Sequence, residues 1–175
     1  MSTPPDTERL RWLLETVRRE AEHLLGTTHR LFRHQIDAAW VDALAHSPEL
    51  AERVDAFGAR FGRLQDSIGH KLIPELRRLL LEPPGAALDN LNRMEKLGLL
   101  ASVDDWVEAR NLRNRLVHEY VRDSGEFAAA LNRARDLAPL LTETYNRVNR
   151  YSRARFAGQD DDWPPAVADD GQPDD

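Results

Sequence analysis

The sequence predicts an all-α fold, an up-and-down bundle of five to six helices, followed by a disordered acidic tail. Two observations predict the bundle: apolar residues recur three or four positions apart in nearly every segment before residue 157, and runs of β-branched residues are few. Composition predicts the tail, because residues 157–175 contain three prolines and seven aspartates and cannot bury enough apolar area to fold. We therefore expect one domain over residues 1–156 and a disordered segment over residues 157–175.

Two helices are expected near the N-terminus. Residues 6–32 form the first, with Asp6 as its cap and with an apolar stripe that must be buried: Leu10, Leu13, Leu14, Val17, Ala21, Leu24 and Leu25. The second, at about 37–46, is short and ends before Ser47.

Two further helices follow in the middle of the chain. The third, at about 48–81, should kink at Pro74, because an interior proline removes one backbone hydrogen bond. The fourth, at about 86–97, is closed by Gly98, the residue type that most often follows a helix.

Two more helices are expected in the second half of the chain. Ser102 is placed to cap a fifth helix at about 103–122, and Ser124 to cap a sixth at about 125–155. Pro139 should bend this sixth helix.

Composition limits the chemistry that the chain can perform. With no cysteine, it can form no disulfide, thiolate nucleophile or cysteine-based metal site. We expect neither a metal nor a cofactor, since the constellations that hold zinc or a metal-bound triphosphate are missing from the sequence. No apolar run approaches the roughly 18 residues of a membrane span, and the N-terminus lacks the order of a secretory signal. These features predict a cytoplasmic protein that does not contact the membrane.

The charge is distributed unevenly along the chain. The net charge is −6, but the seven aspartates of residues 157–175 face no Lys or Arg there, so the rest of the chain is close to neutral. Only two of the 24 basic residues are lysines. An arginine bias suits bidentate phosphate contacts, although a genome of high GC content also produces it.

The expected fifth helix carries the candidate catalytic residues. On a helical wheel its apolar residues fall within one arc, and Arg113 lies inside that arc, so its charge must be paired or must reach solvent. Asn114 and His118 are four positions apart and share a face, which lets the amide orient the imidazole. In the alternative interpretation, Arg113 forms a structural salt bridge with an acid on another helix and His118 is merely exposed. The spacing alone is weak, because Arg18 and His23 repeat it.

The segment from Glu108 to Tyr120 resembles the Arg-Asn-x3-His-x-Tyr signature of HEPN-domain proteins, in particular the HepT-like toxins that pair with minimal nucleotidyltransferases. Two earlier segments, residues 61–66 and 91–98, also resemble the family, and the likeness covers about residues 50–150. The resemblance implies a metal-independent endoribonuclease toxin, active as a homodimer whose two signature helices form one composite site.

The same resemblance implies a role for each residue of the motif. His118 would take the proton of a ribose 2′-hydroxyl, Asn114 would orient the imidazole, and Arg113 would bind phosphate in the RNA substrate. Tyr120 matches the position at which the partner nucleotidyltransferase, acting as antitoxin, attaches AMP. Some proteins with this resemblance are non-catalytic, serving as substrate-binding or antitoxin subunits of a nucleotidyltransferase, and a helical scaffold without a site is a third interpretation.

Two charged features complete the sequence-based hypotheses. The candidate RNA-binding residues are Arg110 and three arginines that recur every three positions on the sixth helix, Arg147, Arg150 and Arg153. The alternative interpretation of these three is a solvated helix face. The acidic tail follows these arginines directly and can compete with RNA for them, with Trp163 as an anchor. The alternative is a tail that only aids solubility.

Overall fold

The structure, a computed structural model, describes residues 6–118, 122–158 and 162–168, and the regular structure within them is entirely helical. The predicted all-α fold is therefore confirmed. The helices are α1 (Glu8–Leu31), α2 (Ala38–Ala43), α3 (Pro48–Ser67), α4 (Ile73–Leu79), α5 (Ala87–Lys96), α6 (Val103–His118) and α7 (Ser124–Phe156).

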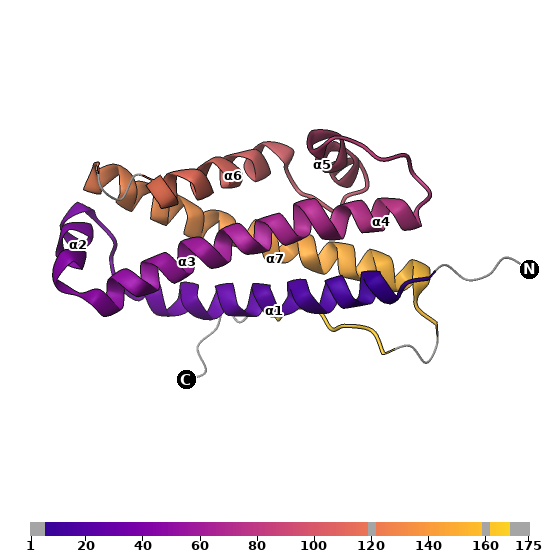
Figure 1. Ribbon diagram of the computed structural model, residues 1–175, viewed down its shortest axis with the longest axis horizontal. Coiled ribbons are helices and arrows are strands. Elements are labelled where there is room, and N and C mark those ends of the chain that lie inside the picture. The colour runs from indigo at the N-terminus through magenta and orange to yellow at the C-terminus, as the bar shows by residue number, and fades with distance from the viewer. Residues whose placement is uncertain (1–5, 119–121, 159–161, 169–175) are drawn as a thin grey trace, which may run out of the picture.

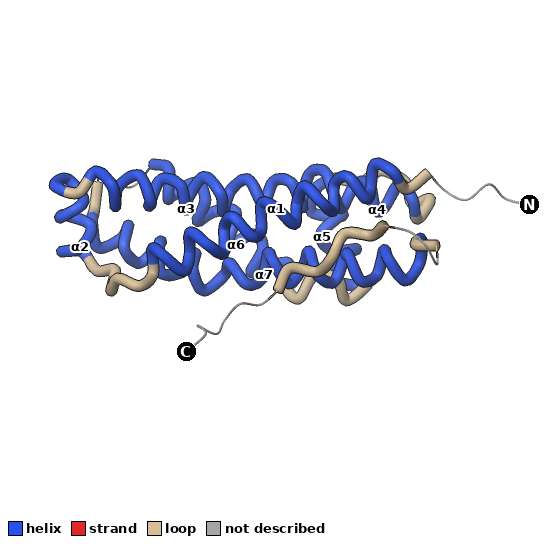
Figure 2. The backbone as a smooth tube through the Cα atoms, turned by 90° about the horizontal axis from the view of Figure 1, so that it is seen from below, coloured by secondary structure: helices blue, strands red, loops and turns tan. Residues whose placement is uncertain are grey.

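The four long helices form the bundle, and the short ones close its ends. Helix α1 packs against α3 and α7, and α6 packs against the same two helices from another side (Figure 1). Helix α2 lies at one end of the bundle against α7, while α5 lies toward the other end against α4 and α6 (Figure 2). The amphipathic stripe predicted for the first helix is buried, except for Leu25, which is half-buried at the edge of the core. No helix in the described ranges is both long and apolar enough to cross a bilayer.

The expected third helix is interrupted before Pro74 rather than kinked at it. A single turn of π-helix, Ile68–Leu72, separates α3 from α4, and Pro74 lies in the first turn of α4. Proline is tolerated there because the first N–H groups of a helix need no partner within it. Pro74 therefore lies at the start of a new α-helix that follows the π-turn. Such π-turns are frequent at functional sites.

Of the two caps predicted for the last two helices, one is confirmed and the other is displaced by one residue. Ser102 caps α6 as predicted, since its Oγ accepts a hydrogen bond from the Asp105 N–H at 3.1 Å. Asp123 rather than Ser124 caps α7, because its carboxylate accepts from the Glu126 N–H at 2.8 Å. Aspartate and serine are both good N-caps, so composition alone could not separate the two.

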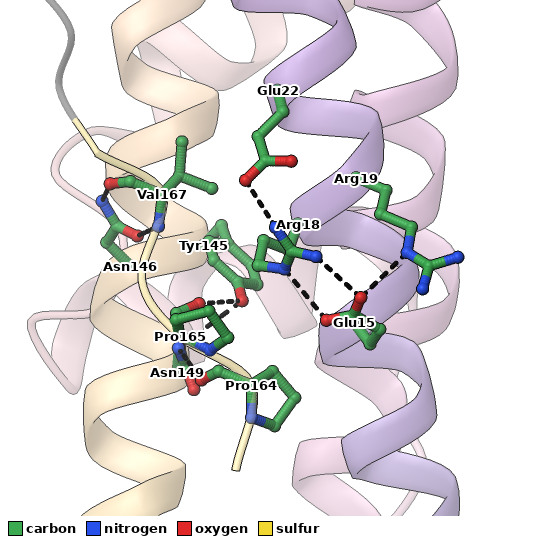
Figure 3. A network of polar contacts seen from close by, with 10 residues as sticks. All are labelled: Glu15, Arg18, Arg19, Glu22, Tyr145, Asn146, Asn149, Pro164, Pro165 and Val167. Atoms are coloured by element: carbon green, nitrogen blue, oxygen red, sulfur yellow. Dashed lines mark hydrogen bonds and ion pairs between the residues drawn. The ribbon is translucent and has the colours of Figure 1, made fainter.

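The prediction of a disordered tail is wrong for residues 162–168. This segment, the C-terminal strap, lies extended along α7 beside α1 (Figure 3). Its Trp163 and Val167 are only 7% and 4% exposed. Trp163 is therefore the anchor that the sequence indicated. The folded part of the chain extends past Phe156.

Side chains of α7 pair with the backbone of the strap, which has no strand beside it. Asn146 binds Val167 twice: its amide N–H donates to the Val167 carbonyl at 3.0 Å, and its oxygen accepts from the Val167 N–H at 2.8 Å. The Tyr145 hydroxyl donates to the Pro165 carbonyl at 2.9 Å (Figure 3). Trp163 Nε1 donates to the Asn149 oxygen at 2.6 Å. These bonds satisfy backbone groups that burial would otherwise leave unpaired.

Candidate functional site

Helix α6 carries the candidate site and is fixed at its N-terminal end. In addition to the Ser102 cap, a carboxylate oxygen of Glu95 accepts a hydrogen bond from the Val103 N–H at 2.7 Å. Farther along, Glu108 forms a bidentate ion pair with Arg133 of α7, both contacts at 2.7 Å, and the hydrogen bond from Arg133 lowers the pKa of Glu108. These contacts hold the N-terminal half of α6 against Glu95 and α7.

Arg113 lies on the face of α6 that meets α3, as its position on the wheel predicts. Its Nη1 donates to Asp66 Oδ1 at 2.6 Å, and each of the two side chains is 38% exposed. This is the inter-helical ion pair that the structural interpretation of Arg113 expected. The same partial exposure leaves the guanidinium within reach of a phosphate at the surface.

A glycine makes room for the Arg113 side chain. A Cβ at Gly62 would lie 2.8 Å from Arg113 Nε and 3.1 Å from its Cγ and Cδ. The arginine therefore crosses α3 over this glycine to reach Asp66. Gly58 and Gly69 also face α6, toward Leu116 and Trp106. Spacings of four and seven residues between glycines are the sequence signal for this close helix contact.

Asp66 connects Arg113 to His70, a histidine that was not among the predicted site residues. His70 belongs to the π-turn and is exposed, and its Nε2 lies 4.0 Å from Asp66 Oδ1. Its spacing of four residues from Asp66 was the available signal, because such pairs share a helix face. Asp66 itself lies in the segment 61–66 that resembles the family, but nothing in the sequence singles out its pairing with Arg113.

A pocket opens beside this ion pair, between α5, α6 and the π-turn, and we call it the α5–α6 pocket. Its volume is about 310 Å³. Two of the predicted site residues, Arg110 and Asn114, line it together with Asp66. The structure therefore brings Arg110 and Asn114 to the place where Asp66 holds Arg113.

The three arginines of α7 do not line the α5–α6 pocket. Positions three apart rotate by about 60° per step around an α-helix, so the three arginines occupy a sector of about 120°. Arg147 pairs with Glu143 and donates to the Gly98 carbonyl at 3.2 Å, and Arg147 and Arg150 both line a hollow beside Val167 of the strap. Arg153 is exposed. A role of these arginines in RNA binding stays a prediction.

His118 is the last residue of α6, and its side chain lies outside the described part of the structure. Tyr120 also lies outside the described residues. Asn114, one turn before His118, is exposed. In the part of the chain that the structure describes, no three His, Asp or Glu side chains gather closely enough to hold a metal ion.

The second Arg-x4-His pair provides an internal comparison. Arg18 of α1 makes two hydrogen bonds to Glu15, at 2.9 and 2.7 Å, and a third to Glu22 on the same helix (Figure 3). Its side chain is 19% exposed, half the value for Arg113. Arg18 is thus built into α1 by carboxylates on both sides, whereas Arg113 reaches one carboxylate across a glycine next to an open pocket.

In comparisons with known proteins, the chain matches no family model, no curated protein and no solved structure. The likeness to HEPN proteins therefore rests on the residues of α6 and the segments before it.

Proposed function

We propose that this protein is a metal-independent endoribonuclease of the HEPN type, the toxin of a pair with a minimal nucleotidyltransferase. One observation carries the proposal: Arg113 is positioned by Asp66 and Gly62 yet is 38% exposed, on the helix that continues through Asn114 and ends at His118. An arginine held in place at the surface is suited to bind a phosphate without reorganisation.

The proposed reaction uses the ribose of the RNA as nucleophile. An imidazole group ordinarily has a pKa of about 6.5, so His118 serves as the base that accepts the 2′-hydroxyl proton. The 2′-oxygen then attacks the adjacent phosphorus, and Arg113 stabilises the negative charge that develops on the phosphate oxygens. The bond from phosphorus to the 5′-oxygen breaks, which leaves a 2′,3′-cyclic phosphate and, after protonation, a 5′-hydroxyl.

The leaving 5′-oxygen needs a proton, and we assign it to the partner's His118 in a homodimer. In support, the outward face of α6 carries Val117, a large apolar side chain that is exposed in the single chain. Burial of such residues favours association. A dimer built on α6 would bring two copies of the motif together.

The proposed antitoxin is a minimal nucleotidyltransferase that transfers AMP to Tyr120 in the cytoplasm. Tyr120 follows His118 by two residues in the sequence. A phosphodiester there adds a negative charge and a bulky nucleoside close to the phosphate-binding arginine, and like charges repel the RNA backbone. AMP attachment would therefore switch the enzyme off.

A non-catalytic role as a substrate-binding or antitoxin subunit of a nucleotidyltransferase is the second candidate. It is favoured by the ion pair with Asp66, which neutralises the guanidinium that catalysis would use. Cleavage activity separates the two functions directly.

The test compares purified wild-type protein with His118→Ala and Arg113→Ala on RNA in EDTA. The matched control is His23→Ala, which removes the histidine of the second Arg-x4-His pair. We expect wild type and the control to cleave RNA, and both site variants to be inactive with unchanged helical circular dichroism. Intact RNA with every protein would favour the non-catalytic candidate, and loss of helicity in the site variants would favour a structural role.

A further inference from the structure

His70 lines the α5–α6 pocket from the π-turn, and we propose that it is a second phosphate-binding residue of the candidate site. In its protonated form it binds a phosphodiester of single-stranded RNA together with Arg110, beside the phosphate that Arg113 holds. This inference rests on the proposed ribonuclease function and adds a substrate contact to it.

The π-turn places the imidazole at the surface. Ile68 and Leu72, the first and last residues of the turn, are fully buried, whereas the side chain of His70 between them is 57% exposed. The ends of the turn are thus held in the core while its middle borders the pocket. A ligand in the pocket can therefore reach the ring.

A carboxylate oxygen of Asp66 is shared by His70 and the proposed catalytic arginine. Asp66 Oδ1 accepts a hydrogen bond from Arg113 Nη1 at 2.6 Å and lies 4.0 Å from His70 Nε2. Because both side chains approach the same oxygen, the imidazole lies close to the guanidinium. The carboxylate also favours the protonated imidazole and offsets the repulsion between the two cations.

The charges at the pocket favour an anionic ligand once His70 is protonated. Among the described residues that line the pocket, only Asp66, His70 and Arg110 carry a charge or can gain one. Asp66 is paired with Arg113, so these two together have no net charge. Arg110 is exposed and forms no ion pair in the part of the chain that the structure describes. A proton on His70 therefore adds a second net positive charge to that of Arg110, and phosphate oxygens accept hydrogen bonds from both groups.

The proposed contact makes the affinity for RNA depend on pH. An imidazole group ordinarily has a pKa of about 6.5, and only its protonated form attracts a phosphate. The contact from His70 is therefore present at lower pH and is lost as the pH rises through this range. Each phosphate contact to a single strand also adds about 0.7 to the slope of log affinity against log salt concentration, so the salt dependence should change in parallel.

The test measures the dissociation constant of a 2′-O-methyl RNA oligonucleotide, which has no 2′-hydroxyl to attack, by fluorescence anisotropy with the full chain at about pH 5.5 and about pH 7.5. His70→Gln removes the titrating group, and His70→Lys makes the positive charge permanent. The matched control is His23→Gln, the same change as His70→Gln at an exposed histidine of α1 that does not line the pocket.

We expect the wild type and the control to bind about tenfold more weakly at the higher pH, as the loss of one charged hydrogen bond predicts. His70→Gln should bind weakly at both pH values, with a salt slope at about pH 5.5 that is smaller by about 0.7, and His70→Lys should bind tightly at both. Equal pH dependence in the wild type and His70→Gln, or no binding by the wild type at the lower pH, would overturn the proposal.

Cleavage of all-ribose RNA separates this proposal from the ribonuclease function. Cleavage by the wild type, together with an unchanged pH dependence of binding in His70→Gln, would refute the contact from His70 and leave the ribonuclease intact. The predicted pattern of binding without any cleavage would uphold the contact and refute the ribonuclease.

Discussion

Gly62→Ala separates the position of Arg113 from the stability of the fold. The added methyl carbon would lie 2.8 Å from Arg113 Nε and 3.1 Å from Cγ and Cδ. Unbonded carbons approach to about 3.5–4.0 Å, so the arginine must move by about 0.5 Å or more. A flexible side chain can make this movement, and it carries the guanidinium away from Asp66.

The expected change in stability is small because two effects oppose each other. Loss of a partly exposed ion pair costs about 0.2–1 kcal/mol of unfolding free energy. Replacement of glycine by alanine inside a helix contributes about 0.8–1 kcal/mol in the other direction. We therefore expect the urea midpoint of Gly62→Ala to equal or slightly exceed that of the wild type.

Activity should fall while stability is kept. Misplacement of a catalytic group by about 1 Å can cost roughly 100-fold in rate, and we expect a loss of that order in RNA cleavage. Gly58→Ala is the control, since its Cβ would meet Leu116 Cβ at an ordinary 3.8 Å and leave Arg113 in place. The reasoning is refuted if the two variants cleave RNA equally fast, or if Gly62→Ala alone is destabilised by more than about 3 kcal/mol, a loss typical of core disruption.

Three further predictions concern the strap and the ion pairs of α1. Trp163→Ala should release the strap and lower the unfolding free energy by less than the about 3–5 kcal/mol lost at a core tryptophan, because the strap can detach locally. Limited proteolysis should then cut the C-terminal segment faster than in the wild type, and an equal rate of cutting would contradict a docked strap. Hydrogen bonds from Arg18, opposed by burial and reinforced by Arg19, lower the pKa of Glu15 to about 2. The stabilisation from Glu15 is therefore present above about pH 4.5 and is lost as the pH falls toward 2. In urea titrations, Glu15→Gln should reduce the dependence of the unfolding free energy on pH in this range, and an unchanged dependence would contradict the prediction. Burial raises the pKa of Tyr145, so the stabilisation from its hydroxyl, which donates to the strap, is present below about pH 10 and is lost as the pH rises further. Release of the strap, monitored by proteolysis, should follow the absorbance of the phenolate, and Tyr145→Phe should remove that coupling.

The helical fold was predictable because its signals are local. The apolar stripe of α1 and the cap at Ser102 can be read from neighbouring residues, and the structure confirms both. The π-turn before Pro74 was not predicted, since a proline shows that the helix is disturbed but not which of several backbone adjustments relieves it. Hydrophobic periodicity therefore predicted the helices better than it predicted the breaks within them.

The candidate site was only partly predictable because its other half comes from a distant segment. The position of Arg113 on an apolar face predicted a pairing or an exposed charge, and both occur. Its partner Asp66 lies 47 residues earlier, and only the packing of α3 on α6 brings the two together. The buried amide oxygen of Gln65, which finds no hydrogen-bond partner among the described residues, was likewise hidden, because such a feature is a property of the folded environment.

The strap was missed because composition averages over a segment. Residues 157–175 are acidic overall, yet their apolar residues are concentrated between Trp163 and Val167. The two prolines between them restrict the unfolded chain and so reduce the entropy lost on docking. Asparagines on α7 then satisfy the backbone, and no sequence period reveals such a pairing.

The central claim is that Arg113 and His118 promote attack by a ribose 2′-hydroxyl, and one measurement tests it most directly. Wild-type protein in EDTA is given an RNA oligonucleotide and the same oligonucleotide with 2′-deoxyribose at the cleaved position, and the product ends are identified by mass spectrometry. We predict that only the all-ribose substrate is cut, to a 2′,3′-cyclic phosphate and a 5′-hydroxyl, and that His118→Ala cuts neither. Cleavage of the deoxy substrate, a requirement for added Mg²⁺, or intact RNA with wild-type protein would contradict the claim.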